Sequence, residues 1–146
     1  MENRYYAYYA FGSVKRLLVY RKVLTKRRGE LQFTTTETLN RASSTAKWRI
    51  SLSSGQQILL YFEKVEFSSK ECLKSYVVLQ YEKIPSKKSS NLIRKYCFNN
   101  PLPALLKIES NEMTVTFHND GESASIKPTL HVKYEGELGL FSKVFT

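Results

Sequence analysis

Residues 48–67 read WRISLSSGQQILLYFEKVEF, two runs of alternating apolar and polar side chains joined by a short polar segment. The side chains on the apolar phase of the two runs are Trp48, Ile50, Leu52, Ile58, Leu60 and Phe62. A period of two sends successive side chains to opposite faces, so each run predicts a β-strand with one buried face. The segment Ser53-Ser54-Gly55 has the composition of a turn and should connect them.

The same period recurs in three later runs, around residues 77–81, 113–117 and 130–134. Turn chemistry separates them, at Pro85–Asn91, Asn99–Pro103 and Asn119–Glu122. Several short strands of this kind favour an all-β sandwich or barrel with antiparallel sheets. The residues predicted to form its core are Trp48, Ile50, Ile58, Leu60, Phe62, Val77, Leu79, Val115, Phe117, Leu130 and Val132.

The first 28 residues differ from the rest in charge and composition. Eight cations and one acid give residues 1–28 a net charge of +7, and residues 29–146 contribute only +3 of the total of +10. Five aromatic residues crowd the stretch from Tyr5 to Phe11. The apolar pattern from Val14 to Val23 suits one face of a short helix and a strand equally well, so its structure stays open. Gly29 marks the predicted start of the folded domain.

An ordered series of landmarks then suggests a family. Trp48-Arg49-Ile50 is followed by Cys72, by Tyr96-Cys97 and by Phe117 with Asp120 three residues later. This series resembles the CUB domain over roughly residues 27–135. The resemblance implies a jelly-roll sandwich of two antiparallel sheets that binds proteins and performs no chemistry. It divides the chain into an N-terminal extension (1–28), a CUB-like domain (29–135) and a C-terminal tail (136–146).

The cysteines follow the family only in part. The resemblance implies a disulfide between Cys72 and Cys97, although reduced thiols are the alternative if the chain stays in the cytosol. The other two cysteines of the family correspond to Arg27 and Ala46 here. The first family disulfide is therefore absent.

Many CUB domains bind calcium, and the resemblance locates the three positions concerned. The last corresponds to Asp120, and the second corresponds to Ser75, which has no charge. The first falls within residues 41–47, which include no acid. Calcium needs several oxygen ligands, mainly carboxylates, so we expect no bound metal and no other cofactor. Asp120, the only retained position, is interpreted as a turn residue.

Catalytic motifs of hydrolases, nucleotide-binding enzymes and zinc proteases do not occur, so the chain is not expected to be an enzyme. His118 and His131 are adjacent to residues predicted to face the core. Both histidines should therefore face outward and have no catalytic function. No apolar run is long enough to span a membrane. The first residues show no signal-peptide pattern, which favours a fragment of a longer protein. The family resemblance nevertheless implies an extracellular protein-interaction module, for adhesion or recognition, in a larger secreted or receptor protein.

The basic segment supports an alternative function. It could bind a polyanion such as heparan sulfate or a nucleic acid. The cations expected to do so are Lys15, Arg16, Arg21, Lys22, Lys26, Arg27 and Arg28.

Overall fold

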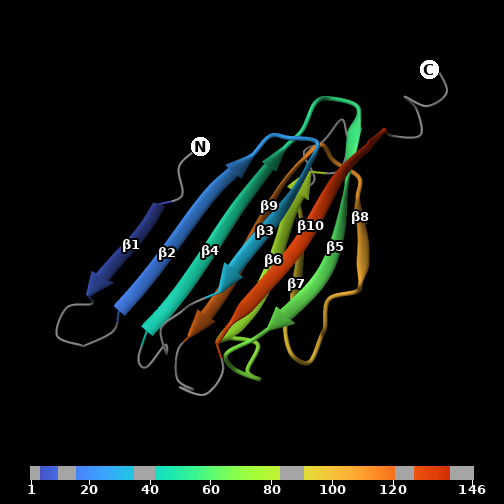
Figure 1. The fold of residues 1–146 in the computed structure, drawn as a ribbon. Coiled ribbons are helices and arrows are strands. Elements are labelled where there is room, and N and C mark those ends of the chain that lie inside the picture. The colour runs from blue at the N-terminus through green and yellow to red at the C-terminus, as the bar shows by residue number, and fades with distance from the viewer. Residues whose placement is uncertain (1–3, 10–15, 35–41, 83–90, 121–126, 139–146) are drawn as a thin grey trace.

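A computed structural model describes residues 4–9, 16–34, 42–82, 91–120 and 127–138, and the regular elements within these ranges are all strands (Figure 1). They are β1 (Arg4–Tyr9), β2 (Arg16–Leu24), β3 (Arg28–Thr34), β4 (Ala42–Ser51), β5 (Gln56–Glu66), β6 (Ser75–Glu82), β7 (Asn91–Tyr96), β8 (Leu105–Ile108), β9 (Glu112–Asp120) and β10 (Thr129–Leu138). The described part of the chain contains no helix that is long and apolar enough to cross a bilayer. The all-β prediction is confirmed.

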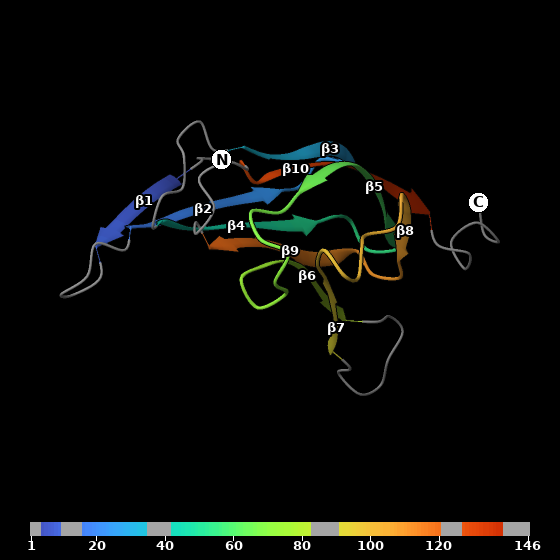
Figure 2. The same cartoon turned by 90° about the horizontal axis from the view of Figure 1, so that it is seen from below.

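Two sheets face each other as the layers of a sandwich (Figure 2). One has the strand order β1-β2-β4-β9-β6-β7, and the other has the order β3-β10-β5-β8. The last two described strands therefore occupy interior positions, with β9 between β4 and β6 and β10 between β3 and β5. Both sheets depend on pairings between residues that are far apart in sequence.

One strand pair departs from the predicted antiparallel arrangement. β2 and β4 run parallel, from the pair Arg16–Ala42 to the pair Leu24–Ile50. Between them the chain enters the other sheet as β3, so it reverses direction twice before it returns beside β2. The sandwich is consequently antiparallel in all pairings of the described strands except this one.

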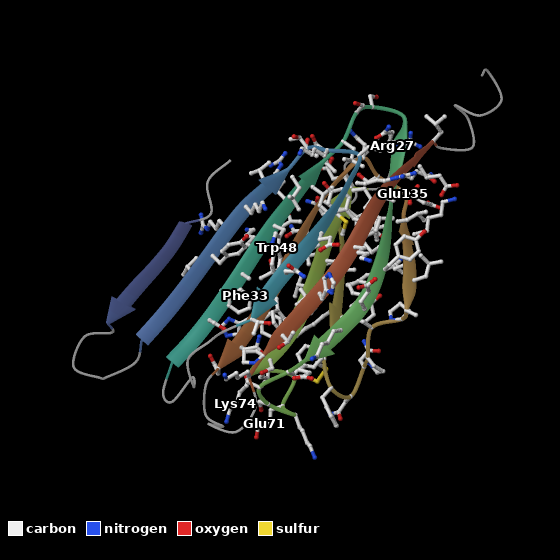
Figure 3. The ribbon with its side chains drawn as sticks, viewed as in Figure 1. Arg27, Phe33, Trp48, Glu71, Lys74 and Glu135 are labelled. Atoms are coloured by element: carbon white, nitrogen blue, oxygen red, sulfur yellow. A yellow bond between two sulfur atoms is a disulfide. The ribbon has the colours of Figure 1, made fainter. Side chains whose placement is uncertain are left out.

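The core lies between the sheets and contains the predicted residues with one exception. Ten of the eleven have at most 1% of their surface exposed: Trp48, Ile50, Ile58, Leu60, Val77, Leu79, Val115, Phe117, Leu130 and Val132. Trp48 and Phe33 both point into the space between the layers (Figure 3). The period-two pattern therefore identified the buried face of each central strand.

Phe62 is the exception, because it is only partly buried at the edge of the core. The register of β5 against β10 shifts here, with Phe62 and Lys64 facing successive residues of β10 and Glu63 left without a partner. Such a bulge adds one residue to a strand and changes the phase of the side chains that follow. Val65 therefore packs against the core on the inner side, three residues after Phe62 instead of two or four.

The N-terminal segment, whose structure the sequence left open, forms strands. Tyr20 of β2 is 5% exposed and packs with its ring centroid 5.7 Å from that of Trp48 and 6.2 Å from that of Phe33. Lys22 shares the inward phase of β2 with Tyr20, and this cation obscured the alternation in the sequence. The boundaries predicted at residues 29 and 135 fall inside β3 and β10, so β2 belongs to the same sandwich as the predicted domain.

Gly29 sits beneath an aromatic ring. It pairs with Tyr134 across β3 and β10, and the Tyr134 hydroxyl donates a hydrogen bond of 2.8 Å to the Lys26 carbonyl oxygen. Burial raises the pKa of Tyr134 above its ordinary value. A Cβ atom on Gly29 would lie 2.6 Å from Cε1 of that ring. The glycine thus allows the tyrosine to bind the turn between β2 and β3.

Replacing Gly29 by alanine should lower the free energy of unfolding by about 1–3 kcal/mol, because the ring or the strand must move to admit the methyl group. Urea denaturation followed by circular dichroism measures this loss. The double variant Gly29→Ala, Tyr134→Ala should lose less than the sum of the two single variants. Strict additivity would contradict the proposed clash.

Candidate interaction site

A buried polar cluster ties the loop before β6 to the ends of β6 and β9. Its inner members are Ser68, Ser75 and Asn119, each at most 1% exposed. The hydroxyl oxygens of Ser68 and Ser75 are 2.9 Å apart, and the Ser68 backbone N–H donates to Asn119 Oδ1 at 3.1 Å. The Ser69 backbone N–H donates to Ser75 Oγ at 3.1 Å. These bonds fix the loop through hydroxyl and amide groups.

Asp120 lies at the outer edge of this cluster. Its Oδ1 accepts a hydrogen bond of 2.8 Å from the Ser43 hydroxyl and lies 3.2 Å from His118 Nε2. Its backbone carbonyl accepts a hydrogen bond of 2.9 Å from the Ser68 hydroxyl. The carboxylate therefore joins β4 to β9, and its Oδ1 already accepts a hydrogen bond from Ser43.

These residues do not fit a calcium ion. Asp120 is the one carboxylate among the expected ligand positions that the structure describes, and its Oδ1 already accepts from Ser43. The Ser75 hydroxyl is bonded to the neighbouring loop. In the described residues, no group of three or more His, Cys, Asp and Glu side chains could hold a metal. Serine hydroxyls and an asparagine amide make the connections between the strands and the loop here.

Millimolar calcium is accordingly expected to leave the melting temperature unchanged relative to EDTA. A micromolar calcium site would instead add about 4 kcal/mol to the free energy of unfolding under these conditions. Differential scanning fluorimetry of the wild type and of Asp120→Ala, each with calcium and with EDTA, checks this. A calcium-dependent increase that Asp120→Ala abolishes would show that the ligand set was assigned wrongly.

The two cysteines form the disulfide that the family resemblance implied. The Cα atoms of Cys72 and Cys97 are 5.3 Å apart, within the usual range for a disulfide. Backbone hydrogen bonds in both directions join Cys97 to Asn100, which closes a turn directly after β7. The bond thus holds the loop before β6 against the turn after β7.

His118 lies on the outer face of the six-stranded sheet, between Thr45 and Tyr76 of the adjacent strands. Thr45 Oγ1 is 2.8 Å from Nδ1, and Asp120 Oδ1 is 3.2 Å from Nε2. Hydroxyl, imidazole and carboxylate occur in this order in hydrolase triads. β4 and β9 are each flanked by two strands, so their backbone N–H groups bond to neighbouring strands rather than to a developing oxyanion. The arrangement connects β4 to β9.

His131 occupies a different surface, the outer face of the four-stranded sheet. Its Nε2 is 3.3 Å from a Glu30 oxygen, and its Nδ1 is 3.2 Å from a Glu63 oxygen. Lys133 also pairs with Glu63, at 3.1 Å. These contacts join β3, β10 and β5 on the outer face of the other sheet.

The structure gathers only some of the cations predicted to bind a polyanion. Lys22, Lys26 and Arg28 line a groove of about 730 Å³ between β2 and β3. Arg28 also forms an exposed ion pair with Glu135, with 3.3 Å between Nη2 and the carboxylate. An anion in this groove would compete with that carboxylate.

The other predicted cations lie elsewhere. Arg27 donates through Nε to the Gly136 carbonyl oxygen at 3.0 Å, and Arg21 is exposed on the opposite face of β2. Lys15 and the side chain of Arg16 lie outside what the structure describes. The seven residues are therefore not one described surface, and their function in polyanion binding stays a prediction.

The polar cluster of Ser68, Ser75 and Asn119 could not be recognised from the sequence. Ser68 and Asn119 have no recognisable motif, because hydroxyl and amide groups occur in every loop. One signal was present, namely the replacement of an acid by Ser75 at a position expected to bind a cation. Where a cation ligand is lost, the buried polar groups around it need other hydrogen-bond partners.

Comparisons with known proteins agree with the fold. The family model of the CUB domain matches residues 21–129. No curated protein sequence matches significantly. The CUB1-EGF-CUB2 domain of human MASP-1/3 superimposes with a TM-score of 0.56 at 20% identity, covering 80% of this chain and 41% of that one. The MASP-1 CUB2 domain bound to Ca²⁺ gives a TM-score of 0.55 at 18% identity, and the match covers 77% of this chain and 96% of that one.

A third similar structure is the full extracellular region of zebrafish Gpr126/Adgrg6. It gives a TM-score of 0.53 at 21% identity, covering 82% of this chain and 15% of that one. The chain therefore spans about two fifths or less of the multidomain structures, and nearly all of the isolated CUB2 domain. The two-sheet fold and the family match agree, and this chain belongs to the CUB domain family.

Proposed function

We propose that this chain is a non-catalytic recognition module that binds a protein ligand as part of a larger secreted or receptor protein. The match of the CUB family over residues 21–129 carries the proposal. CUB domains are generally non-enzymatic interaction modules and occur in extracellular proteins. Binding by this module requires no cofactor.

The disulfide is a second support. Disulfides persist in oxidising compartments and are rare in the cytosol. The bond between Cys72 and Cys97 joins two loops at one end of the sandwich, which suits a domain that functions outside the cell. A rigid scaffold that holds loops in place is a common way to build a recognition surface.

A binding screen tests the proposal. The oxidised, folded chain is displayed as a multimer and offered to an array of extracellular protein domains and to heparin, in calcium and in EDTA and over a range of salt concentrations. We expect saturable binding to at least one protein domain, equal in calcium and EDTA. The reduced and unfolded chain is the control and should not bind.

The salt series separates the two candidate functions. Binding to a polyanion falls steeply with salt, because bound counterions are released from the polymer. Retention on heparin with a steep salt dependence, together with no bound protein domain, would refute the proposed function and favour the polyanion alternative.

A further inference from the structure

Large apolar side chains are exposed on both sides of the disulfide. Leu73 follows Cys72 and is 85% exposed, and Phe98 follows Cys97 and is 53% exposed. Single exposed apolar residues are common and need no explanation. Here each of the two follows a cysteine of the disulfide, and the Cα atoms of those cysteines are 5.3 Å apart, so the backbones that carry Leu73 and Phe98 lie near each other. Apolar groups that gather in this way mark interaction surfaces.

The turn that carries Leu73 is held in a fixed shape. The Lys74 and Ser75 backbone N–H groups both donate to the Glu71 carbonyl oxygen, at 3.0 and 3.1 Å. Lys74 Nζ also pairs with Glu71 at 3.0 Å, and Ser69 Oγ accepts from the Glu71 N–H at 3.1 Å. The leucine is thus presented to solvent on an ordered turn, so binding there costs little conformational entropy.

Two lysines border this apolar surface, and each lies over an aromatic ring. Lys70 Nζ is 5.3 Å from the ring centroid of Phe98, and Lys95 Nζ is 4.4 Å from that of Tyr76. Cations are attracted to ring faces when they lie within about 6 Å. Neither lysine has a carboxylate partner in the described parts of the chain. Lys70, Leu73, Tyr76, Lys95 and Phe98 together are called the disulfide-end patch.

The disulfide-end patch is separate from the basic residues of the N-terminal segment. Figure 3 shows Glu71 and Lys74, which belong to the same turn as Leu73, at the end of the sandwich opposite to Arg27 and Glu135. β7, which carries Lys95 of the patch, is an edge strand that pairs only with β6 among the described strands. Ile93 of β7 is 64% exposed and extends the apolar surface along this edge.

We propose that the disulfide-end patch is the docking surface for the protein ligand, and that it binds an extended segment carrying acidic and large apolar side chains. This inference rests on the proposed function and specifies its partner. Carboxylates of the segment pair with Lys70 and Lys95, and its apolar side chains cover Leu73 and Phe98. The part of the β7 edge that precedes Lys95 accepts the segment lengthwise, in the manner of strand addition. At Lys95 the carbonyl oxygen already accepts a hydrogen bond of 2.9 Å from Asn100 Nδ2.

Titration with a synthetic peptide tests the proposal. The probe alternates glutamate with leucine and phenylalanine, and the control peptide has lysine in place of each glutamate. Fluorescence anisotropy gives the affinity, and amide chemical shifts of the labelled chain give the location. We expect saturable binding of the acidic peptide only, with shifts at residues 70–76 and 93–98. No binding, equal binding of both peptides, or shifts elsewhere would overturn the proposal.

Substitutions in the disulfide-end patch are compared with substitutions of similarly exposed residues in the other sheet. Leu73→Ser and Phe98→Ser should each weaken binding roughly tenfold, as truncation of a central contact does. Leu105→Ser on β8 is the control, because Leu105 has the same 53% exposure as Phe98 and lies in the other sheet. Lys95→Gln should weaken binding and flatten its salt dependence, and Lys107→Gln on β8 should do neither. Equal effects in the two sheets would refute the assignment.

The screen with extracellular domains distinguishes this proposal from the one on which it rests. If a protein domain binds the wild type and the Leu73→Ser, Phe98→Ser double variant equally, the patch is not the docking surface although the recognition function stands. If no protein domain binds the wild type, the recognition function itself fails.

Discussion

Deleting residues 1–26 is expected to unfold the sandwich or to lower its free energy of unfolding by several kcal/mol. The deletion removes β2, and with it the buried ring of Tyr20 between Trp48 and Phe33. Loss of one large buried aromatic side chain alone costs about 3–5 kcal/mol. It also exposes the edge of β4 that pairs with β2, which invites association with other chains. Urea denaturation, followed by the fluorescence of Trp48, measures the effect.

Smaller changes show which part of the segment matters. Deleting residues 1–9 removes β1, which pairs only with β2 among the described strands, so we expect a much smaller loss. Tyr20→Ala should reproduce much of the loss caused by the long deletion. Tyr61→Ala is the matched control, because Tyr61 is 37% exposed. An unchanged unfolding midpoint after deletion of residues 1–26 would contradict this expectation and support the predicted boundary at Gly29.

Removing the disulfide should have the second largest effect. The double variant Cys72→Ala, Cys97→Ala is expected to lose about 3 kcal/mol of unfolding free energy, because the bond restricts the unfolded chain between two positions 25 residues apart. The variant should still fold, since the buried aromatic and aliphatic core between the sheets is unchanged. Comparison of urea midpoints for the oxidised wild type, the reduced wild type and the variant provides the measurement.

The reduced wild type and the double variant should have similar midpoints, because both lack the bond. A midpoint for both that equals that of the oxidised protein would show that the bond contributes nothing to stability. Loss of peptide binding in the folded double variant would in addition agree with the position of Leu73 and Phe98 beside the bond.

The buried faces of the strands could be predicted from sequence, because alternation is a local property of the chain. Trp48, Leu79 and Val132 each belong to runs in which burial repeats every second residue. Phe62 could not be placed correctly, because the bulge at Glu63 depends on the register against β10. The parallel pairing of β2 was equally hidden. Lys22 faces inward and interrupts the apolar alternation of β2. The strand that pairs with β2 is β4, which follows β3 in the chain.

The candidate sites were predictable only where the family supplied a pattern. The pairing of Cys72 with Cys97 followed from the resemblance to the CUB domain. The hydroxyl of Ser68 gave no such signal, since its partners Ser75 and Asn119 come from different strands. Likewise, the positions of Lys70 and Lys95 over aromatic rings depend on tertiary contacts that no local pattern encodes.

The interior positions of β9 and β10 have a consequence for biosynthesis. A ribosome makes the chain from its N-terminus, so β3, β4, β5 and β6 are complete before the strands that lie between them exist. During that interval the nascent chain has unpaired edges in both sheets, and such edges promote aggregation. Folding must wait until Leu138 has left the exit tunnel. Covering of these edges during translation should therefore raise the yield of folded protein.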